Sequence, residues 1–478
     1  MIGIVGLAPS AARECRERFR SAAAQLGLRV PGLRITVNLA PADVRKEGAA
    51  FDLPVAVAVL AGAGHVPGDR VKRWGFVGEL GLDGTSRPVR GSLPIALRFG
   101  RTKGVEGLIV PDANLRETQP ARDLRVLGAG SLGQVLRFLR GEAELRSADD
   151  VRGPTRPTPA PACDFGDISG QAIAKRALEI AAAGGHNILL RGAPGVGKTM
   201  LARALPSILP PLTRGEALEA TAVHSVAGRL PAGAGVLEGR PFRAPHHTIT
   251  SVGLVGGGVP VQPGEISLAH HGVLFLDELT EFRALTLEAL RQPLEEGVVR
   301  ITRAGTQVRY PARFLLAAAM NPCPCGRLLE PDRDCTCDPA VVGRHAGRLS
   351  APLLDRIDMH VDVPAVGWEV LRSGPGPPES PAMRGRVHEA RSRASRRYGR
   401  PAMFNGSLSP RSIRDHCKLD EPSDAMLRRG SAAFRLSARA CHRILRVSRT
   451  IADLEGSEVI RPVHVAEALQ YRVREPSR

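Results

Sequence analysis

Residues 186–209 read HNILLRGAPGVGKTMLARALPSIL, in which a glycine-rich loop lies between a strand-like and a helix-like run. Its centre, residues 192–199, matches the pattern G-x-x-x-x-G-K-[ST], in which glycines let backbone N–H groups turn inward around phosphate oxygens. The flanks have the composition of a buried strand and of a helix whose N-terminus adds positive charge; an ordinary glycine-rich turn is the alternative. We predict a nucleotide site in which Lys198 reaches the β- and γ-phosphates and Thr199 binds Mg²⁺. The expected loop consists of Gly192, Ala193, Pro194, Gly195, Val196, Gly197, Lys198 and Thr199.

A pair of acids ends the next strongly apolar run, GVLFLDE at residues 272–278. We expect Asp277 to hold the magnesium shell and Glu278 to orient and polarise the attacking water. A buried strand that ends in two acids by chance is the alternative. The phosphate loop earlier in the chain favours the functional interpretation.

Two further segments complete the expected nucleotide site. RFLLAAAMNP, at 313–322, reads as a strand that ends in Asn321, which we expect beside the γ-phosphate. LLDRID, at 353–358, offers Arg356 as a finger donated in trans to a neighbouring subunit's nucleotide. The alternative for Arg356 is a structural ion pair with Asp355 or Asp358.

Arg439, in the run LSARA, is a candidate phosphate contact from a C-terminal helical region. Its alternative is a solvated helix face.

Four of the eight cysteines are clustered as two C-x-C pairs: Cys323, Cys325, Cys335 and Cys337. Four thiolates on one short polar loop suit a tetrahedral structural Zn²⁺. Free thiols are the alternative, and disulfides come third. Because the pairs begin two residues after Asn321, metal loss is expected to disturb ATP turnover. The small number of cysteines does not indicate a disulfide scaffold, so we expect the protein to be located in the cytoplasm. No apolar run is long enough for a transmembrane helix.

The pattern along the chain predicts an α/β protein with several parts. Strands and helices alternate over 164–368, as in a domain built on a largely parallel sheet. Residues 1–145 read as a separate N-terminal domain, and 146–163, rich in Pro, Arg and Thr, as a linker. Residues 382–478 are helical by pattern.

The net charge of +18, from 66 basic and 48 acidic residues, favours a polyanionic partner, nucleic acid first. Only six of the basic residues are lysine, so the charge is also consistent with a compositional preference for arginine.

Two loops are candidates for DNA contact, at 240–258 and in an expected hairpin at 298–312, because arginines on such loops bind phosphates without reading sequence. The alternatives for the histidines are packing or hydrogen bonding near the ATP site, or metal ligation. The alternative for the hairpin arginines is a solvated strand face. The candidate residues are Arg243, His246, His247, Arg300, Arg303 and Arg309.

Residues 164–475 resemble the magnesium-chelatase-like AAA+ ATPases, in the YifB/ComM branch. The resemblance implies an AAA+ P-loop domain with a C-terminal helical lid, ATP and Mg²⁺ as cofactors, and a homo-oligomeric ring, usually a hexamer. It assigns nucleotide roles to Lys198, Thr199, Asp277, Glu278, Asn321, Arg356 and Arg439. The stretches that carry it include ALEIAAAGGHNILLRGAPGVGKTMLARALPSILPPL, RPFRAPHHTIT, PGEISLAHHGVLFLDEL, ALRQPLEEG, AAAMNPCPCG, LLDRIDMHVDVP and LSARACHRILRVSRTIADLEG.

The N-terminal region resembles the Lon protease catalytic domain, an α+β fold, in the stretches at 34–62, 76–91 and 107–115. Lon-type proteases carry a nucleophilic serine in a DGPSAG stretch, but the comparable EGAAFD has Ala49 and Ala50, so we reject protease activity. Members of this branch usually have a further strand pair before GIVGL, whereas this chain begins within that segment. We therefore expect either that the start of the chain is mis-assigned or that the N-terminal domain is truncated at its start.

The resulting hypothesis is an ATP-driven motor that acts on DNA. The resemblance implies a helicase that supports branch migration during recombination of incoming DNA. A protein-remodelling AAA+ chaperone is an alternative, although no clear aromatic-apolar pore loop is present. A chelatase motor subunit is the third, and the Lon-like region argues against it.

Overall fold

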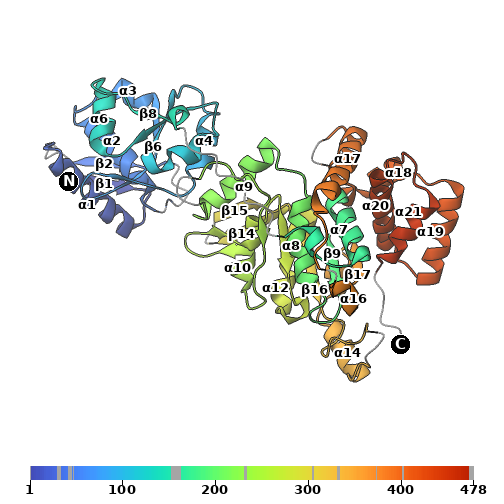
Figure 1. Ribbon diagram of the computed structural model, residues 1–478. Helices are drawn as coiled ribbons and strands as arrows, with labels where there is room; N and C mark the ends of the chain where they lie inside the picture. Colours follow the sequence, from blue (N-terminus) through green and yellow to red (C-terminus); the bar gives the residue numbers. More distant parts are fainter. Residues whose placement is uncertain are drawn as a thin grey trace.

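The computed structural model describes residues 2–29, 34–40, 46, 48–151, 163–230, 234–303, 306–330, 334–372, 374–400 and 403–472. Three parts follow one another along the molecule (Figure 1). They are the N-terminal region, up to residue 151, the region with the predicted nucleotide site (163–372, here called the nucleotide region) and the C-terminal helices, from residue 380. Within the described residues, no helix has the length and apolar character needed to span a bilayer.

A four-stranded sheet, in the order β3-β6-β7-β8, centres the N-terminal region. Its first three strands run parallel and β8 pairs antiparallel with β7. Apart from it, β1 (Ile2–Val5) pairs in parallel with β2 (Ile35–Asn38), and β4 (Glu79–Leu80) forms a hairpin with β5 (Ser86–Arg87). The bounds of the sheet strands are β3 Trp74–Phe76, β6 Gly107–Pro111, β7 Arg125–Ala129 and β8 Arg146–Ser147.

Helices cover this region and join it to the next. The apolar stretch at 52–62 forms α2, and most of its apolar side chains are buried. Where α4 lies beside α9 (Figure 1), the Gly91 N–H donates to the Ser225 carbonyl at 3.3 Å. The bounds are α1 Pro9–Gln25, α2 Asp52–Gly62, α3 Gly68–Lys72, α4 Ser92–Phe99, α5 Leu115–Thr118, α6 Leu132–Arg140 and α9 Arg214–Val226.

The linker expected from residue 146 onward differs from the structure at its start. Arg146 and Ser147 form β8, and Ser147 caps the short turn Ala148–Asp150. A strand of two residues is too short to give a periodic hydrophobic signal, so the pattern missed it. Residues 152–162 of the expected linker lie outside the described residues.

A five-stranded parallel sheet, in the order β10-β13-β16-β9-β17, forms the centre of the nucleotide region. Every residue of β13 and β16 is buried, as expected for a parallel sheet covered on both faces. Helices α7 (Ala172–Gly184) and α8 (Lys198–Ile208) pack on one face together with C-terminal helices. The strand bounds are β9 Ile188–Arg191, β10 Phe242–Arg243, β13 Val273–Leu276, β16 Leu315–Met320 and β17 Met359–Asp362.

Short helices and strands lie between the strands of the five-stranded sheet. The hairpin expected at 298–312 is confirmed as β14 (Val298–Arg303) and β15 (Thr306–Pro311), while its turn, Ala304–Gly305, lies outside the described residues. The remaining elements are α10 Ser251–Val255, β11 Gly256–Gly257, β12 Gln262–Pro263, α11 Glu265–Leu268, α12 Ala284–Glu288, α13 Arg291–Glu296, α14 Pro339–Ala346, α15 Ala351–Leu354 and α16 Trp368–Arg372.

In the residues of the C-terminal part that the structure describes, α17 to α21 are the α-helices, which confirms the expected helical pattern. Proline in the first turn starts α17, α18, α19 and α21, where its fixed φ suits a helix and its missing N–H costs nothing. Ser437 caps α20 by accepting a hydrogen bond from the Ala440 N–H. The bounds are α17 Ser380–Tyr398, α18 Pro410–His416, α19 Glu421–Phe434, α20 Ala438–Leu454 and α21 Pro462–Gln470.

Candidate functional site

The loop between β9 and α8 adopts a conformation that its glycines make possible. Gly195 has a φ of +81° and Gly197 a φ of +93°, in the left-handed region that other residues rarely occupy. The loop follows the carboxyl end of β9, a strand with neighbours on both sides, and α8 begins at Lys198. This is the position at which open parallel sheets bind ligands, with a helix N-terminus facing the site.

Lys198 is buried, with 8% of its surface exposed. Its Nζ donates to the carbonyls of Gly192 and Ala193, both at 2.7 Å, and to Asn321 Oδ1 at 3.1 Å. Burial lowers the pKa of Lys198, and the carboxylates of Asp277 and Glu278 act in the opposite direction. Because an ammonium group has three N–H donors, a phosphate that reached Lys198 would take the place of these local acceptors.

The expected magnesium ligands lie together. Thr199 Oγ1 donates to Asp277 Oδ2 at 2.7 Å, across the carboxyl edge of the sheet. A hydroxyl and a carboxylate are hard oxygen ligands, and Mg²⁺ is commonly held by one or two such groups together with nucleotide phosphates. The residues present therefore fit the metal that this class of site uses.

Glu278 holds an unusual backbone conformation next to Asp277. Its φ is +50°, in the left-handed region, and its side chain is 58% exposed. Strained backbone of this kind concentrates at functional sites. Its carboxylate lies 3.3 Å from Nδ1 of His247, whose ring packs on that of His246 at 4.0 Å between centroids. Of the interpretations considered for the two histidines, this geometry corresponds to packing beside the candidate nucleotide site.

Asn321 follows the last residue of β16 and completes the cluster through its contact with Lys198. Its own backbone carbonyl lies 3.1 Å from Nε2 of His345, on α14. Besides the contact of His345 with Asn321, the sequence did not indicate that Gln171 contacts the phosphate loop. Its side-chain amide donates to the carbonyls of Val196, in the phosphate loop, and Pro364, after β17.

Arg356 and Arg439 lie at the other edge of the sheet. Both line a cavity of about 970 Å³ that also contacts residues at the amino ends of the strands. Arg356 forms an ion pair with Glu295, not with either of the aspartates considered in its alternative. Those acids pair elsewhere: Asp355 with Arg443 at 3.5 Å and Asp358 with Arg446 at 3.7 Å. The residues of the cavity at the amino ends of the strands are Asn187, Gly272, Leu315 and Asp358.

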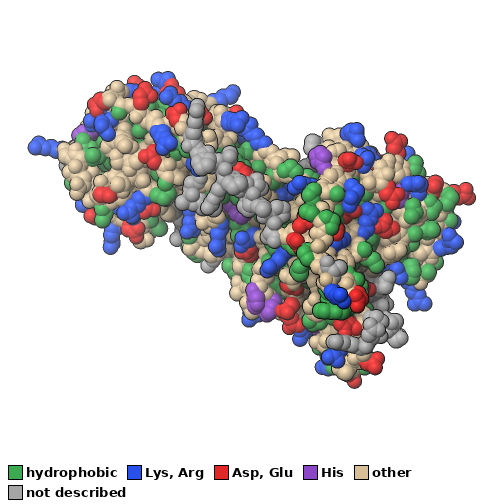
Figure 2. Space-filling view, in the orientation of Figure 1, with side chains coloured by type: hydrophobic (Ala, Val, Ile, Leu, Met, Phe, Trp, Pro, Cys, Tyr) green, Lys and Arg blue, Asp and Glu red, His purple; other side chains and the backbone are tan. Residues whose placement is uncertain are grey.

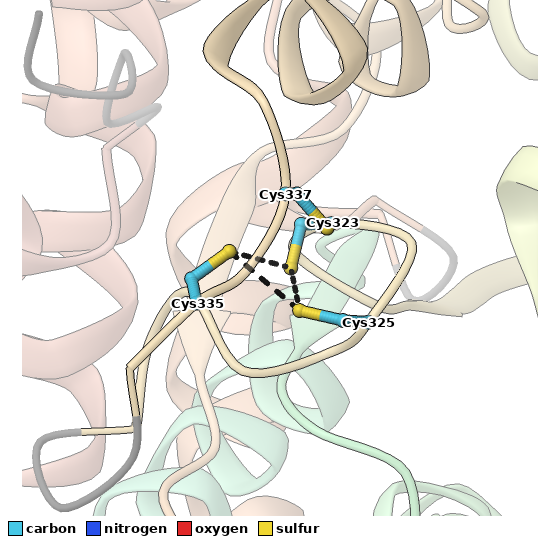
Figure 3. Close-up of side chains that lie close together, drawn as sticks. All are labelled: Cys323, Cys325, Cys335 and Cys337. Atoms are coloured by element: carbon cyan, nitrogen blue, oxygen red, sulfur yellow. Dashed lines mark hydrogen bonds between the residues drawn. The ribbon is translucent and has the colours of Figure 1, made fainter.

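The four clustered cysteines converge on one point (Figure 3). Their sulfur atoms all lie within 4.8 Å of one another, and three of the distances are 3.4, 3.6 and 3.6 Å. A tetrahedral zinc with bonds of about 2.3 Å places its sulfurs roughly 3.8 Å apart, whereas a disulfide needs about 2.0 Å. The backbone N–H of Arg327 lowers the pKa of Cys325 to about 6, whereas burial and the neighbouring thiols raise the pKa values of the other three cysteines. The donor set therefore fits Zn²⁺.

The candidate DNA contacts fall into two groups. Arg243 makes a bidentate ion pair with Glu265, at 2.6 and 2.8 Å, which already occupies its guanidinium. Arg300 and Arg309 are direct cross-strand neighbours on the hairpin, and both are exposed, although Arg300 also forms an ion pair with Glu296. The side chain of Arg303 lies outside the described residues. On the visible face of the molecule, basic side chains are interspersed with acidic ones rather than gathered into one stripe (Figure 2).

A glycine-rich phosphate loop at the carboxyl edge of a parallel sheet, with Asp277 beside Thr199 and Asn321 beside Lys198, defines a P-loop domain of the AAA+ class. Comparison with known proteins then identifies the family. The profile described as "Magnesium chelatase, subunit ChlI" matches residues 164–371. "Subunit ChlI of Mg-chelatase" matches residues 1–114, and "Magnesium chelatase, subunit ChlI C-terminal" matches residues 378–472.

Individual relatives match almost the whole chain. Competence protein ComM of Haemophilus influenzae is 42% identical over 472 residues, covering 98% of this chain and 91% of the relative. Protein YifB of Escherichia coli is 41% identical over 471 residues, with the same coverage. The magnesium-chelatase 38 kDa subunit of Rhodobacter capsulatus is 25% identical over 346 residues, covering 66% of this chain and 89% of the relative. The chain belongs to the magnesium-chelatase-like family that includes the ComM and YifB proteins, a family that indicates ATPase activity.

Proposed function

We propose that the chain is an ATPase that works as a ring, with each nucleotide held between two copies. The observation that carries this proposal is the position of Arg356 and Arg439. The phosphate loop follows the carboxyl end of β9, whereas these arginines share a cavity with residues at the amino ends of the same strands. At about 3.3 Å per residue, β9 alone separates the two edges by roughly 13 Å.

An arginine at the amino edge of the sheet lies on the opposite side from the phosphate loop of its own copy. We therefore expect it to contact a phosphate that is bound by a neighbouring copy. Arginine fingers donated in trans stabilise charge on the transferring phosphoryl group. The hydrogen bonds from Arg443 to the carbonyls of Leu354 and Ile357 hold the segment that carries Arg356 against α20. Movement of the C-terminal helices, which we assign as the lid, would therefore move the finger. A hexamer, as usual for AAA+ proteins, is the assembly we propose.

Within each copy, different residues bind the phosphates, hold Mg²⁺ and activate the attacking water. Lys198 and the loop N–H groups bind the phosphates, and Thr199 and Asp277 hold Mg²⁺, which neutralises charge on the phosphate oxygens. Asn321 and Glu278 place and polarise the attacking water, with His247 beside the Glu278 carboxylate.

Replacing Glu278 by glutamine is expected to leave ATP binding intact and to lower hydrolysis by about 10² to 10⁴-fold, because general-base catalysis contributes about this much. Steady-state phosphate release and binding of a fluorescent ATP analogue measure the two effects. Glu281→Gln is the matched control, because Glu281 lies three residues further along the same segment and its carboxylate pairs with Arg348 rather than with a residue of the site. Equal hydrolysis rates in Glu278→Gln and the unaltered protein would remove Glu278 from this role.

We further propose that the motor acts on DNA, in keeping with the resemblance to branch-migration helicases. The supporting feature is the hairpin β14–β15, in which exposed residues alternate with half-buried ones around Ile301 and Val308. Arg300 and Arg309 share the exposed face, and such arginines bind phosphates without reading sequence. We also propose that the protein is located in the cytoplasm, that its N-terminal domain is Lon-like but not proteolytic, and that it holds a structural Zn²⁺.

The double variant Arg300→Ala/Arg309→Ala is expected to weaken DNA binding uniformly across sequences. Two lost phosphate contacts should reduce the slope of log affinity against log salt by about 2. Fluorescence anisotropy with forked DNA at several salt concentrations measures this slope, and Arg428→Ala/Arg429→Ala on α19 is the control. A slope unchanged in the hairpin variant would contradict the assignment. ATPase stimulation by unfolded protein, and not by forked DNA, would favour a chaperone instead.

A further inference from the structure

The cysteine loop begins and ends at the nucleotide site. Cys323 is fully buried and follows Asn321 by two residues, and Asn321 contacts Lys198. At the other end, Cys337 is followed by Asp338, which caps α14, and His345 of that helix lies 3.1 Å from the Asn321 carbonyl. Both arms of the cysteine cluster are thus connected to the residue that we place beside the γ-phosphate.

The loop also packs directly on the phosphate-binding loop. Gly326, between the two cysteine pairs, has a φ of +81°, and a Cβ built there would collide with Cδ of Pro194. Only glycine fits this position without displacing Pro194, which is part of the phosphate loop. The contact joins the cysteine cluster to a second element of the same site.

We propose that a zinc ion on Cys323, Cys325, Cys335 and Cys337 holds Asn321 and the phosphate loop in their binding geometry, so that metal occupancy sets the affinity for nucleotide. Four metal–thiolate bonds would fix a loop whose described residues, 323–330 and 334–337, form no helix or strand. Without them, the backbone of Gly326 is free to leave Pro194, and the end of β16 loses its anchor. The inference rests on the proposed nucleotide site for its effect, but not for metal binding itself.

Metal binding is measured first, without reference to activity. Purified full-length protein is expected to contain one zinc per chain, and Cys325→Ser/Cys335→Ser to contain none. Cobalt in place of zinc should give the intense sulfur-to-metal absorption of a thiolate site, because all four ligands are sulfur. Absence of both zinc and cobalt binding in the unaltered protein overturns the proposal.

Coupling is measured as affinity for a fluorescent ADP analogue in the zinc-loaded, chelated and reloaded protein. Chelation is expected to weaken binding by about tenfold or more, a change of about 1.4 kcal/mol, and zinc to restore it. Equal affinities in the loaded and chelated forms overturn the coupling, while failure of the zinc-loaded protein to bind ADP overturns the proposed function instead.

Gly326→Ala tests the contact with Pro194 while keeping all four thiols. We expect weaker ADP binding by about tenfold at full zinc content, because the added methyl group displaces Pro194. Gly104→Ala is the matched control, since Gly104 has a similar φ of +83° with no atom within 4 Å of the added carbon. Unchanged ADP affinity in Gly326→Ala overturns the proposed route, whatever its zinc content.

Discussion

Lys198→Ala is expected to abolish ATP hydrolysis and to weaken nucleotide binding strongly. Removing one preorganised donor from a site of developing charge costs about 10² to 10³-fold in rate. Lys198 is the buried cation of the phosphate loop and contacts the end of β16 as well. We therefore expect a loss at least this large, measured as phosphate release at saturating ATP.

The fold of this variant is checked separately, because the carbonyls of Gly192 and Ala193 lose their donor. Circular dichroism and the thermal midpoint serve this purpose. Lys72→Ala is the matched control, since Lys72 is 82% exposed on α3, in the N-terminal region. Hydrolysis retained in a folded Lys198→Ala protein would refute the assigned site.

Arg356→Ala carries the second large effect. An arginine finger contributes about 10³ to 10⁵-fold to phosphoryl transfer, so the variant should hydrolyse ATP at least about 10³-fold more slowly. ATP binding should change much less, because the phosphate loop of each copy is untouched. Steady-state hydrolysis and analogue binding separate the two quantities.

A structural role for Arg356 has its own control. Arg356 pairs with Glu295, so a loss of activity through this ion pair would also appear in Glu295→Gln. We expect that variant to keep most of its activity, since it leaves the guanidinium in place. Equal losses in the two variants would assign Arg356 a structural role.

The parts of the site that the sequence predicted are those that local geometry determines. The loop around Lys198 is one contiguous pattern, and Asp277 and Asn321 each follow a recognisable apolar strand. Carboxyl ends of parallel strands meet at one edge of a sheet, so these residues were expected to lie together, and the structure brings them together. Likewise, the two C-x-C pairs predicted the cysteine cluster by spacing alone.

Contacts between distant segments could not be predicted in this way. The sequence indicated Arg243 as a DNA contact, but in the structure its guanidinium forms an ion pair with Glu265. Arg356 pairs with Glu295 rather than with its sequence neighbours, because other arginines occupy those aspartates. No local pattern indicates that Gly326 packs on Pro194. The division of the chain into domains and the roles of the individual site residues stay predictions.

Mixing the two inactive variants, Lys198→Ala and Arg356→Ala, tests directly whether a nucleotide site is shared between two copies. The first keeps its finger and the second keeps its phosphate loop, so a mixed assembly contains interfaces with both. Random mixing in equal amounts completes about one quarter of the interfaces of a closed ring. We predict that ATP hydrolysis reappears in the mixture, up to about a quarter of the unaltered rate. A mixture that stays as inactive as its components, although mass photometry shows that the two variants co-assemble, would contradict a nucleotide site shared between copies.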